Sequence, residues 1–187
     1  MYKILIVEEG KRLESMSMKL LELIVLKKQY FKVYRISAKV FFQGIEDTVD
    51  LLMKENHIRF STIIEPGELS IEPDLIKTVC LNLLDNARKA VGQNGKVYLR
   101  GKGLATGYQF VVKDNGCGIA ATELSKIKEA FYMVDKSRSR SAGGAGLGLA
   151  ICEQIIELHH ASINFESVLG QGTTVTVVLE GVKVDEV

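Results

Sequence analysis

The sequence predicts an α/β sandwich, with helices packed against a mixed β-sheet, preceded by one long helix at the N-terminus. Two kinds of apolar pattern lead to this fold class. Apolar residues two apart mark strands, and apolar residues three or four apart mark amphipathic helices. Helices separate groups of strands along the chain, and most strands have a sequential neighbour with which they can pair, which is typical of such a sandwich.

Residues 3–30 have the pattern of a single long helix that needs neighbouring helices. Its seam residues recur at heptad-like spacing: Ile6, Leu13, Met16, Leu20 and Leu23. Other apolar residues lie beside the seam, so the helix is apolar on several faces, as in a bundle. We therefore expect residues 1–32 to be a partial stem that pairs with another helix or, as a homodimer, with a second copy of the chain. A strand at residues 2–7 is the alternative for the first turns.

Residues 33–187 are expected to form one domain. Its predicted elements are, in order, a strand at 33–40, a helix at 41–56, a strand at 59–64, a helix at 73–91, strands at 96–102 and 108–114, a short helix at 122–128, a helix at 146–160, and strands at 162–167 and 173–180. The first helix has four apolar residues that are expected to face inward: Ile45, Val49, Leu52 and Met53. The strand after it alternates at period two and ends at the turn Pro66–Gly67.

The helix at 73–91 begins at Glu72-Pro73-Asp74, because proline suits the first turn of a helix, and it ends at a glycine-rich turn. Its apolar residues form a core stripe: Ile76, Val79, Cys80, Leu83, Leu84, Ala87 and Val91. The two alternating segments after the turn are expected to pair with each other. Residues 115–146 are rich in glycine, so we expect them to be irregular apart from the short helix.

Composition excludes several functional classes. Lys plus Arg (24) nearly balances Asp plus Glu (23), so no overall field favours DNA, RNA or an anionic membrane. Cys80, Cys117 and Cys152 lack the spacing of disulfide partners or zinc ligands, which fits a reducing cytosol. The apolar stretch at the N-terminus is far shorter than the roughly 20 residues that span a bilayer. We expect a cytoplasmic domain, although a parent protein could be anchored through other segments.

A strip of polar residues lies beside the core stripe of the helix at 73–91. Asn82, Asn86 and Lys89 are at positions i, i+4 and i+7 and therefore share one face. Asparagine is a mediocre helix former, so two aligned asparagines call for an explanation. An amide oxygen together with a triphosphate would satisfy Mg²⁺, and the lysine would supply a point charge for the phosphates. A solvated helix face is the alternative.

Three glycine-containing segments follow. Asp114-Asn115-Gly116-Cys117-Gly118-Ile119 comes directly after a strand and could present a carboxylate to an exocyclic amine, or could be an ordinary turn. Residues 143–149 alternate glycine with other residues and lead into a helix, whose first N–H groups bind anions. Their spacing fits neither a dinucleotide fingerprint nor a Walker loop, and a flexible linker is the alternative. Residues 170–174 open the last strand and could be a simple hairpin turn.

The joint order of these four segments resembles the ATPase superfamily shared by gyrase, the ninety-kilodalton heat-shock chaperones, mismatch-repair ATPases and histidine kinases. The residues and spacing of the segments resemble those of histidine kinases in particular. Residues 82–90 are similar to their N box, 114–119 to their first glycine box and 144–149 to their second. The resemblance covers about residues 35–181, and residues 9–28 look like the second stem helix. It implies a two-layer, Bergerat-type fold with a mainly antiparallel sheet, and ATP and Mg²⁺ as cofactors.

The resemblance also implies roles for individual residues. Asn86 would be the Mg²⁺ ligand with Asn82 as its companion, Lys89 would meet the phosphates, and Asp114 would take the adenine amino group. The other residues expected to contact the nucleotide are Gly116, Gly118, Ile119, Gly144, Gly146, Leu147, Gly148, Leu149 and Thr173. Residues 128–143 would be a mobile ATP lid, and its members expected to reach the nucleotide are Phe131, Tyr132, Lys136, Arg138 and Arg140. A solvated charge run is an equal alternative for the basic residues of the lid.

The chain departs from the family pattern at four positions. Lys128 and Ala130 stand where the first Phe and the Pro of the Phe-x-Pro-Phe box would be. Met133 replaces a common basic residue, and Ala90 replaces the aromatic residue that usually follows the N-box lysine. We expect these departures to affect lid contacts and ATP affinity, but not the fold.

The phosphoacceptor histidine of such kinases is missing from the chain. His57, His159 and His160 lie outside the stem helix and have no acidic successor, so we interpret them as surface or capping residues. The sequence therefore predicts a catalytic domain that binds ATP–Mg²⁺ and transfers phosphate to a histidine elsewhere, on a stem helix of the same kinase, with a response regulator downstream. The alternatives are a catalytically idle nucleotide-binding or dimerisation module, and a serine kinase of the anti-sigma type.

Overall fold

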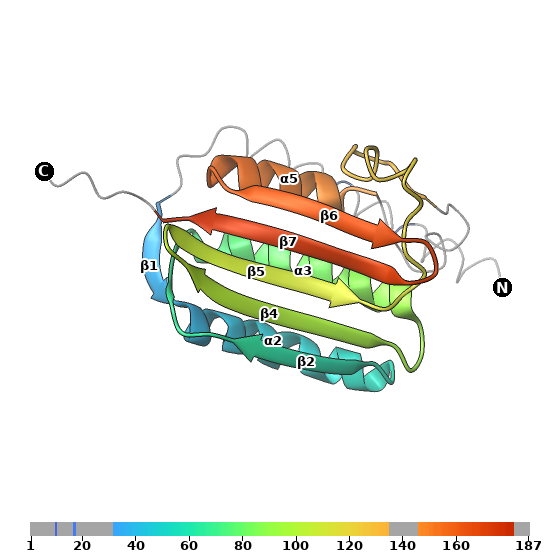
Figure 1. Ribbon diagram of the computed structural model, residues 1–187, viewed down its shortest axis with the longest axis horizontal. Coiled ribbons are helices and arrows are strands. Elements are labelled where there is room, and N and C mark those ends of the chain that lie inside the picture. Colours follow the sequence, from blue (N-terminus) through green and yellow to red (C-terminus); the bar gives the residue numbers. More distant parts are fainter. Residues whose placement is uncertain (1–9, 11–16, 18–31, 135–145, 182–187) are drawn as a thin grey trace, which may run out of the picture.

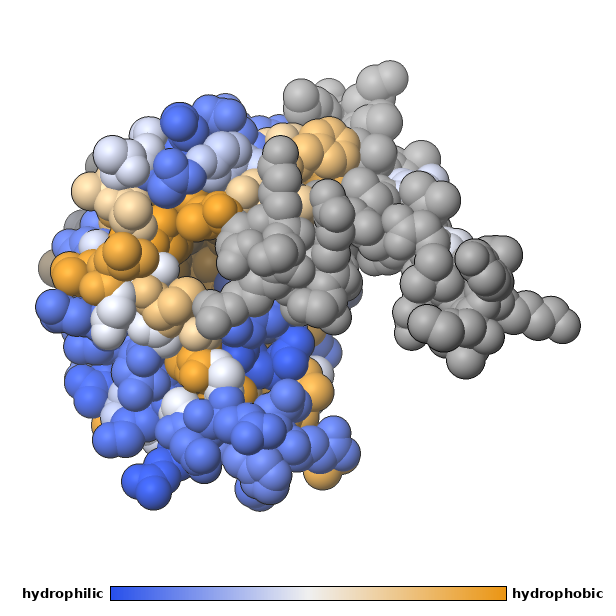
Figure 2. Space-filling view, turned by 90° about the vertical axis from the view of Figure 1, so that its right-hand side faces the viewer, coloured by the Kyte–Doolittle hydropathy of each residue, from blue (hydrophilic) through white to orange (hydrophobic). Residues whose placement is uncertain are grey.

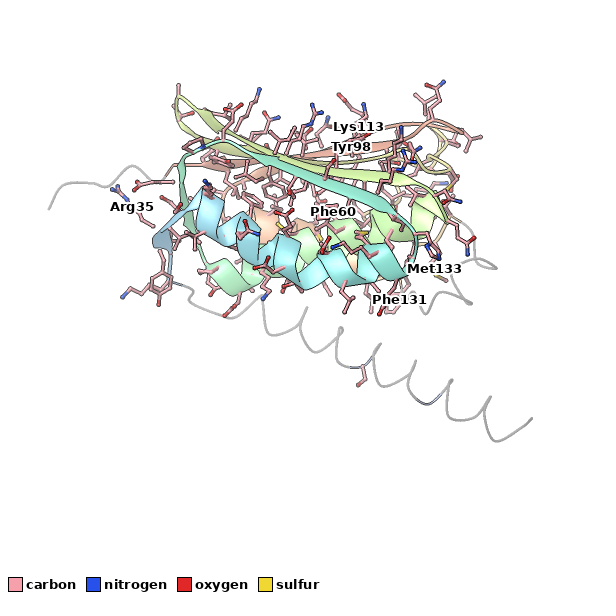
Figure 3. The ribbon with its side chains drawn as sticks, turned by 90° about the horizontal axis from the view of Figure 1, so that it is seen from below. Arg35, Phe60, Tyr98, Lys113, Phe131 and Met133 are labelled. Atoms are coloured by element: carbon pink, nitrogen blue, oxygen red, sulfur yellow. The ribbon has the colours of Figure 1, made fainter. Side chains whose placement is uncertain are left out.

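The structure is a computed structural model that describes residues 10, 17, 32–134 and 146–181. Its described part has two layers, a five-stranded sheet and three helices that all pack on one face of it (Figure 1). Figure 3 shows Phe60 directed between the sheet and the helices, whereas Tyr98 and Lys113 lie on the other side of the sheet. The predicted sandwich is confirmed, and the predicted stem helix, apart from the helical residues Gly10 and Ser17, lies outside the described residues.

The elements are the strands β1 (Tyr34–Ser37), β2 (Arg59–Ile64), β3 (Glu68–Ile71), β4 (Lys96–Leu104), β5 (Gly107–Asp114), β6 (Ser162–Val168) and β7 (Gly172–Glu180), and the helices α2 (Ala38–Glu55), α3 (Pro73–Val91) and α5 (Gly148–Leu158). The sheet has the order β2-β4-β5-β7-β6, in which only β2 and β4 run parallel. β1 and β3 form a separate antiparallel pair. The sheet is therefore mixed and mainly antiparallel, as the family resemblance implied.

The core lies between the sheet and the helix layer. The predicted stripe of α3 is buried, apart from the half-buried Val91 at its C-terminal end. On α2, Ile45, Val49 and Met53 are buried as predicted, but Leu52 is 42% exposed, so the prediction for Leu52 was wrong. These three buried residues follow one another at i, i+4 and i+8, and Leu52 lies about 100° away from Met53 around the helix.

Several element boundaries differ from the prediction. The strand expected at 33–40 ends at Ser37, because Ala38 and Phe42 are already fully buried on the same face of α2 as Ile45. The four-residue strand β3 was missed. The short helix predicted at 122–128 is wrong: the segment is a series of turns in which, for example, the Glu123 N–H donates to Ala120 O at 2.9 Å. Helix α5 is shorter than the predicted 146–160.

His159 joins the C-terminal end of α5 to the start of α3. The Glu72 N–H donates to Nε2 of His159 at 3.1 Å, so the ring proton is on Nδ1, which donates to Ile155 O at 2.7 Å. Burial of the ring lowers the pKa of His159, because it disfavours the imidazolium form. The histidine therefore acts as a neutral cap, in agreement with its predicted role.

No helix within the described ranges is both long enough and apolar enough to cross a bilayer.

Candidate functional site

A cavity of about 630 Å³ opens at the end of the sheet where β5 finishes. Helix α3 forms one wall, and the segments around Asp114, Tyr132, Gly146 and Thr173 complete the lining. Figure 2 looks onto this end of the molecule and shows a hollow bordered by hydrophobic surface. Its volume lies in the usual range for small-molecule sites.

Most of the residues predicted from the sequence line this one cavity. They are Asn82, Asn86, Lys89, Asp114, Gly118, Ile119, Tyr132, Gly146, Gly148, Leu149 and Thr173. Gly116, Phe131 and Leu147 are described but do not line it. Gly144, Lys136, Arg138 and Arg140 lie outside the described residues. The cavity thus gathers side chains and glycines from four separate segments of the chain.

The polar strip of α3 faces the cavity beside the core stripe. Asn82 is half-buried next to Gly148, where an added Cβ would lie 3.0 Å from Asn82 Oδ1. Asn86 is exposed, and no hydrogen bond of its side-chain amide is recorded within the described part of the chain. Its amide oxygen therefore presents an accessible donor atom for a hard cation. Lys89 is already paired, with its Nζ 2.7 Å from Asp85 Oδ2.

Asp114 presents a buried carboxylate at the tip of β5. The residue is 6% exposed, and its Oδ1 accepts hydrogen bonds from the N–H groups of Gly116 at 2.7 Å and Thr173 at 3.3 Å. Burial raises the pKa of Asp114, and these two hydrogen bonds oppose that shift. Its Oδ2 accepts no hydrogen bond from the described residues, so it can accept one from a ligand.

Glycines shape the backbone around this carboxylate. Gly118 has a φ of +65°, and a Cβ there would lie 2.1 Å from Val168 O. Gly116 packs against helix α3, because an added Cβ would meet Ala90 O at 2.6 Å. The predicted role of Gly116 in nucleotide contact is therefore accompanied by a packing role, which brings the first glycine box against the end of α3.

A backbone hydrogen bond joins Phe131 to Gly146, which lines the cavity. The Phe131 N–H donates to Gly146 O at 2.8 Å. Gly146 has a φ of +68°, and a Cβ there would lie 2.8 Å from the Phe131 carbonyl carbon. Figure 3 shows Phe131 and Met133 at the same end of the molecule. Leu147 is fully buried, so its side chain belongs to the core.

The sequence reasoning missed the apolar floor and part of the charged wall. Phe165, Val175 and Val112 form one row across β6, β7 and β5, and all three line the cavity. Strand alternation carried a signal for this row, because these residues share the face of the sheet that packs against the helices. Asp85 and Arg88 also line the cavity, and the i, i+3 and i, i+4 spacings of Asp85 from Arg88 and Lys89 were visible in the sequence.

The family profile described as "Histidine kinase-, DNA gyrase B-, and HSP90-like ATPase" matches residues 71–182. The chain belongs to this family. The match spans the polar strip of α3 and all three glycine segments, so the resemblance identified from the sequence is confirmed at the level of the family.

Curated relatives of this ATPase domain include sensor kinases. The sensor protein kinase WalK of Staphylococcus saprophyticus is 40% identical over 111 residues, which are 58% of this chain and 18% of that relative. The circadian input-output histidine kinase CikA of Synechococcus elongatus is 40% identical over 106 residues, which are 57% of this chain and 14% of that relative. The chain therefore matches less than a fifth of the length of these two proteins. It carries the histidine-kinase-type ATPase domain of sensor kinases.

Solved structures of histidine kinases share the fold. The nucleotide-free catalytic domain of histidine kinase ThkA has a TM-score of 0.71 at 24% identity and covers 80% of this chain and 96% of that one. Full-length ShkA in complex with AMPPNP has a TM-score of 0.79 at 22% identity and covers 96% of this chain and 39% of that one. The ATPase-domain fold is therefore common to all three.

Proposed function

We propose that the chain binds ATP with Mg²⁺ in this cavity and serves as the catalytic domain of a two-component sensor histidine kinase. The observation that carries the proposal is the convergence of Asn86, Asp114 and Gly146 on one cavity, although 28 and 32 residues separate them along the chain. The amide oxygen of Asn86 suits a hard cation, and the buried carboxylate of Asp114 suits an exocyclic amine. The glycine backbone at Gly146 suits phosphate oxygens.

The base-binding end would lie at the tip of β5. Asp114 Oδ2 would accept a hydrogen bond from the adenine amino group, while Oδ1 remains bound to its two N–H donors. Ile119 and the row formed by Val112, Val175 and Phe165 would contact the faces and edges of the ring. A planar apolar base with a single exocyclic amine matches this combination of an apolar floor and one buried acceptor.

The triphosphate would lie along the polar strip of α3. Asn86, with Asn82 beside it, offers amide oxygens of the class that fits Mg²⁺, which would neutralise charge that develops during phosphoryl transfer. Lys89 would give up part of its pairing with Asp85 to meet the phosphates. The backbone at Gly146 and Gly148 would let the phosphates approach closely.

The acceptor would be a histidine outside this chain, on a stem helix of the same kinase. Its ring nitrogen would attack the γ-phosphorus in line, forming an N–P bond as the bond to the β–γ bridging oxygen breaks and ADP leaves. A response regulator would then receive the phosphoryl group.

We also propose that the N-terminal helix contributes to a homodimer and that the domain works in the cytoplasm, where ATP is available.

Phosphoryl transfer is expected in trans only. The chain alone should bind ATP without labelling itself, because no histidine of the described domain is presented on a stem helix. The measurement is transfer of label from γ-labelled ATP, without and with a stem fragment of the same kinase that bears the acceptor histidine. Label on the stem fragment would support the kinase assignment, and label on the chain itself would contradict the separate acceptor. Nucleotide binding without transfer to the stem fragment would favour a catalytically idle module.

Nucleotide is expected to protect Cys117 from alkylation. Cys117 is exposed and lines the cavity, whereas Cys80 and Cys152 are buried and serve as internal controls. MgATP at about ten times its Kd should slow the reaction of Cys117 with iodoacetamide about tenfold, because the free fraction falls by that factor. Mass spectrometry of the three cysteine peptides measures the rates. MgGTP, which lacks the exocyclic amine at this position, should protect less, and equal rates with and without MgATP would exclude binding in this cavity.

A further inference from the structure

A charged cluster that the proposed contacts leave unexplained lines the cavity beside Asn86. Asp85 stands at its centre, with Oδ2 2.7 Å from Lys89 Nζ and Oδ1 2.7 Å from Arg88 Nη2. Arg88 Nε also donates to Asp85 Oδ1 at 3.1 Å, and Arg88 Nη1 contacts Asn56 Oδ1, at the end of α2, at 3.5 Å. The cluster therefore holds Asp85 between two cations on the wall that would face the triphosphate.

Asp85 places a carboxylate on this wall of the cavity. Both of its oxygens contact cationic groups, Oδ2 with Lys89 and Oδ1 with Arg88, as expected for an ionised carboxylate. The side chain of Asp85 is 40% exposed, and that of Lys89 is 28% exposed. An incoming polyanion would thus meet an ionised carboxylate and a lysine that is already paired with it.

We propose that Asp85 makes the site selective for the Mg²⁺-loaded nucleotide over the metal-free triphosphate. This inference rests on the proposed function. Metal-free ATP would have to draw Lys89 away from Asp85 and leave two like charges close together in a partly enclosed cavity. Mg²⁺ brings two positive charges, so Lys89 can be shared between the carboxylate and the phosphates. Asp85 itself would add a hard oxygen close to the cation.

A purely structural role for Asp85 leads to a different expectation. If Asp85 only held Lys89 in the correct rotamer, its removal would weaken binding of ATP and MgATP by the same factor. If it only supported helix α3 as an i, i+4 ion pair, its removal would slightly lower the melting temperature and leave nucleotide binding unchanged. The ratio of the two affinities therefore separates electrostatic selection from both structural roles.

The test compares Asp85→Asn with wild type by calorimetric titration, with ATP in EDTA and with MgATP, at low ionic strength. We expect Asp85→Asn to tighten binding of metal-free ATP about fivefold or more, while MgATP affinity changes less than about twofold, as like-charge repulsion near a partly exposed wall predicts. Asp85→Glu keeps the charge and should keep the wild-type ratio. Asp74→Asn, on an exposed position in the first turn of the same helix, is the matched control and should change neither affinity.

Two outcomes would overturn the inference. One is an unchanged ratio of the two affinities in Asp85→Asn, which includes equal weakening of ATP and MgATP, and the other is an equal change in the Asp74→Asn control. Thermal unfolding shows whether each variant is folded. If Asp85→Asn does not fold, Asp85→Glu tests the inference, which predicts that this variant keeps the wild-type ratio of the two affinities. Failure of wild type to bind MgATP at all would instead overturn the proposed function, and this inference with it.

Discussion

Replacement of Asp114 with asparagine is expected to weaken MgATP binding about 30- to 100-fold, the loss of a hydrogen bond to a charged acceptor in a buried site. The two N–H groups of Gly116 and Thr173 already point at Oδ1. In Asp114→Asn, these donors would keep the carbonyl oxygen at the Oδ1 position, so the NH₂ group would take the place of Oδ2. A donor would then face the adenine amino group, which is itself a donor.

The loss of affinity in Asp114→Asn should occur without loss of stability. Burial raises the pKa of Asp114 in the folded state, so the ionised carboxylate destabilises the fold at pH values above that pKa, and its neutral replacement removes this cost. Calorimetric titration with MgATP measures the affinity, and urea unfolding at neutral pH measures the stability. Asp47→Asn, on the exposed side of α2, is the matched control and should bind as wild type does. Unchanged affinity in Asp114→Asn would contradict the assigned base pocket.

Replacement of Gly172 with alanine is expected to lower the free energy of unfolding by about 3 kcal/mol or more, from a strained φ together with a steric clash. Gly172 has a φ of +107°, and a Cβ there would lie 2.1 Å from Asp114 O. The contact is with backbone of the strand tip, which no side-chain rotation can relieve. The melting temperature should fall by about 10 °C, and MgATP affinity should fall as well, because Asp114 must move.

Two other glycines serve to distinguish the cost of a positive φ from the cost of a steric collision with the new Cβ. Gly170 has a φ of +79° but nothing within 4 Å of an added Cβ, so Gly170→Ala should cost only about 1 kcal/mol. Gly44 lies within α2 with open space around it, and Gly44→Ala should stabilise the helix by up to about 1 kcal/mol. From highest to lowest, the expected order of melting temperatures is Gly44→Ala, wild type, Gly170→Ala and Gly172→Ala. A Gly172→Ala variant as stable as Gly170→Ala would show that the collision is absent.

Much of the fold could be predicted because its longest elements carry strong periodic patterns. Helix α3 has seven apolar residues in register, and its predicted bounds of 73–91 agree with those observed. Strand β3 has only four residues and depends on Leu69 and Ile71 packing into a core assembled by other segments. The parallel pairing of β2 with β4 crosses α3 and β3 in the sequence, so local patterns alone do not specify it.

The candidate site was predictable to the extent that its chemistry depends on residue type. The sequence itself shows two asparagines on one helix face and a carboxylate before glycines. The structure brings Asn86 and Asp114 to one cavity. The pairing of Lys89 with Asp85 follows ordinary i, i+4 spacing, but rotamers and burial decide which carboxylate a lysine prefers. The packing of Gly116 against Ala90 depends on how a strand tip meets a helix end, which no local pattern encodes.

The 2.8 Å hydrogen bond between Phe131 and Gly146 has an engineering consequence. The bond holds the backbone of Phe131 next to that of Gly146, so the residues that flank the intervening segment are already close together. A longer or shorter segment at this place would change a closure entropy that grows only with the logarithm of its length. The length of this segment can therefore vary among related domains at a small cost in free energy.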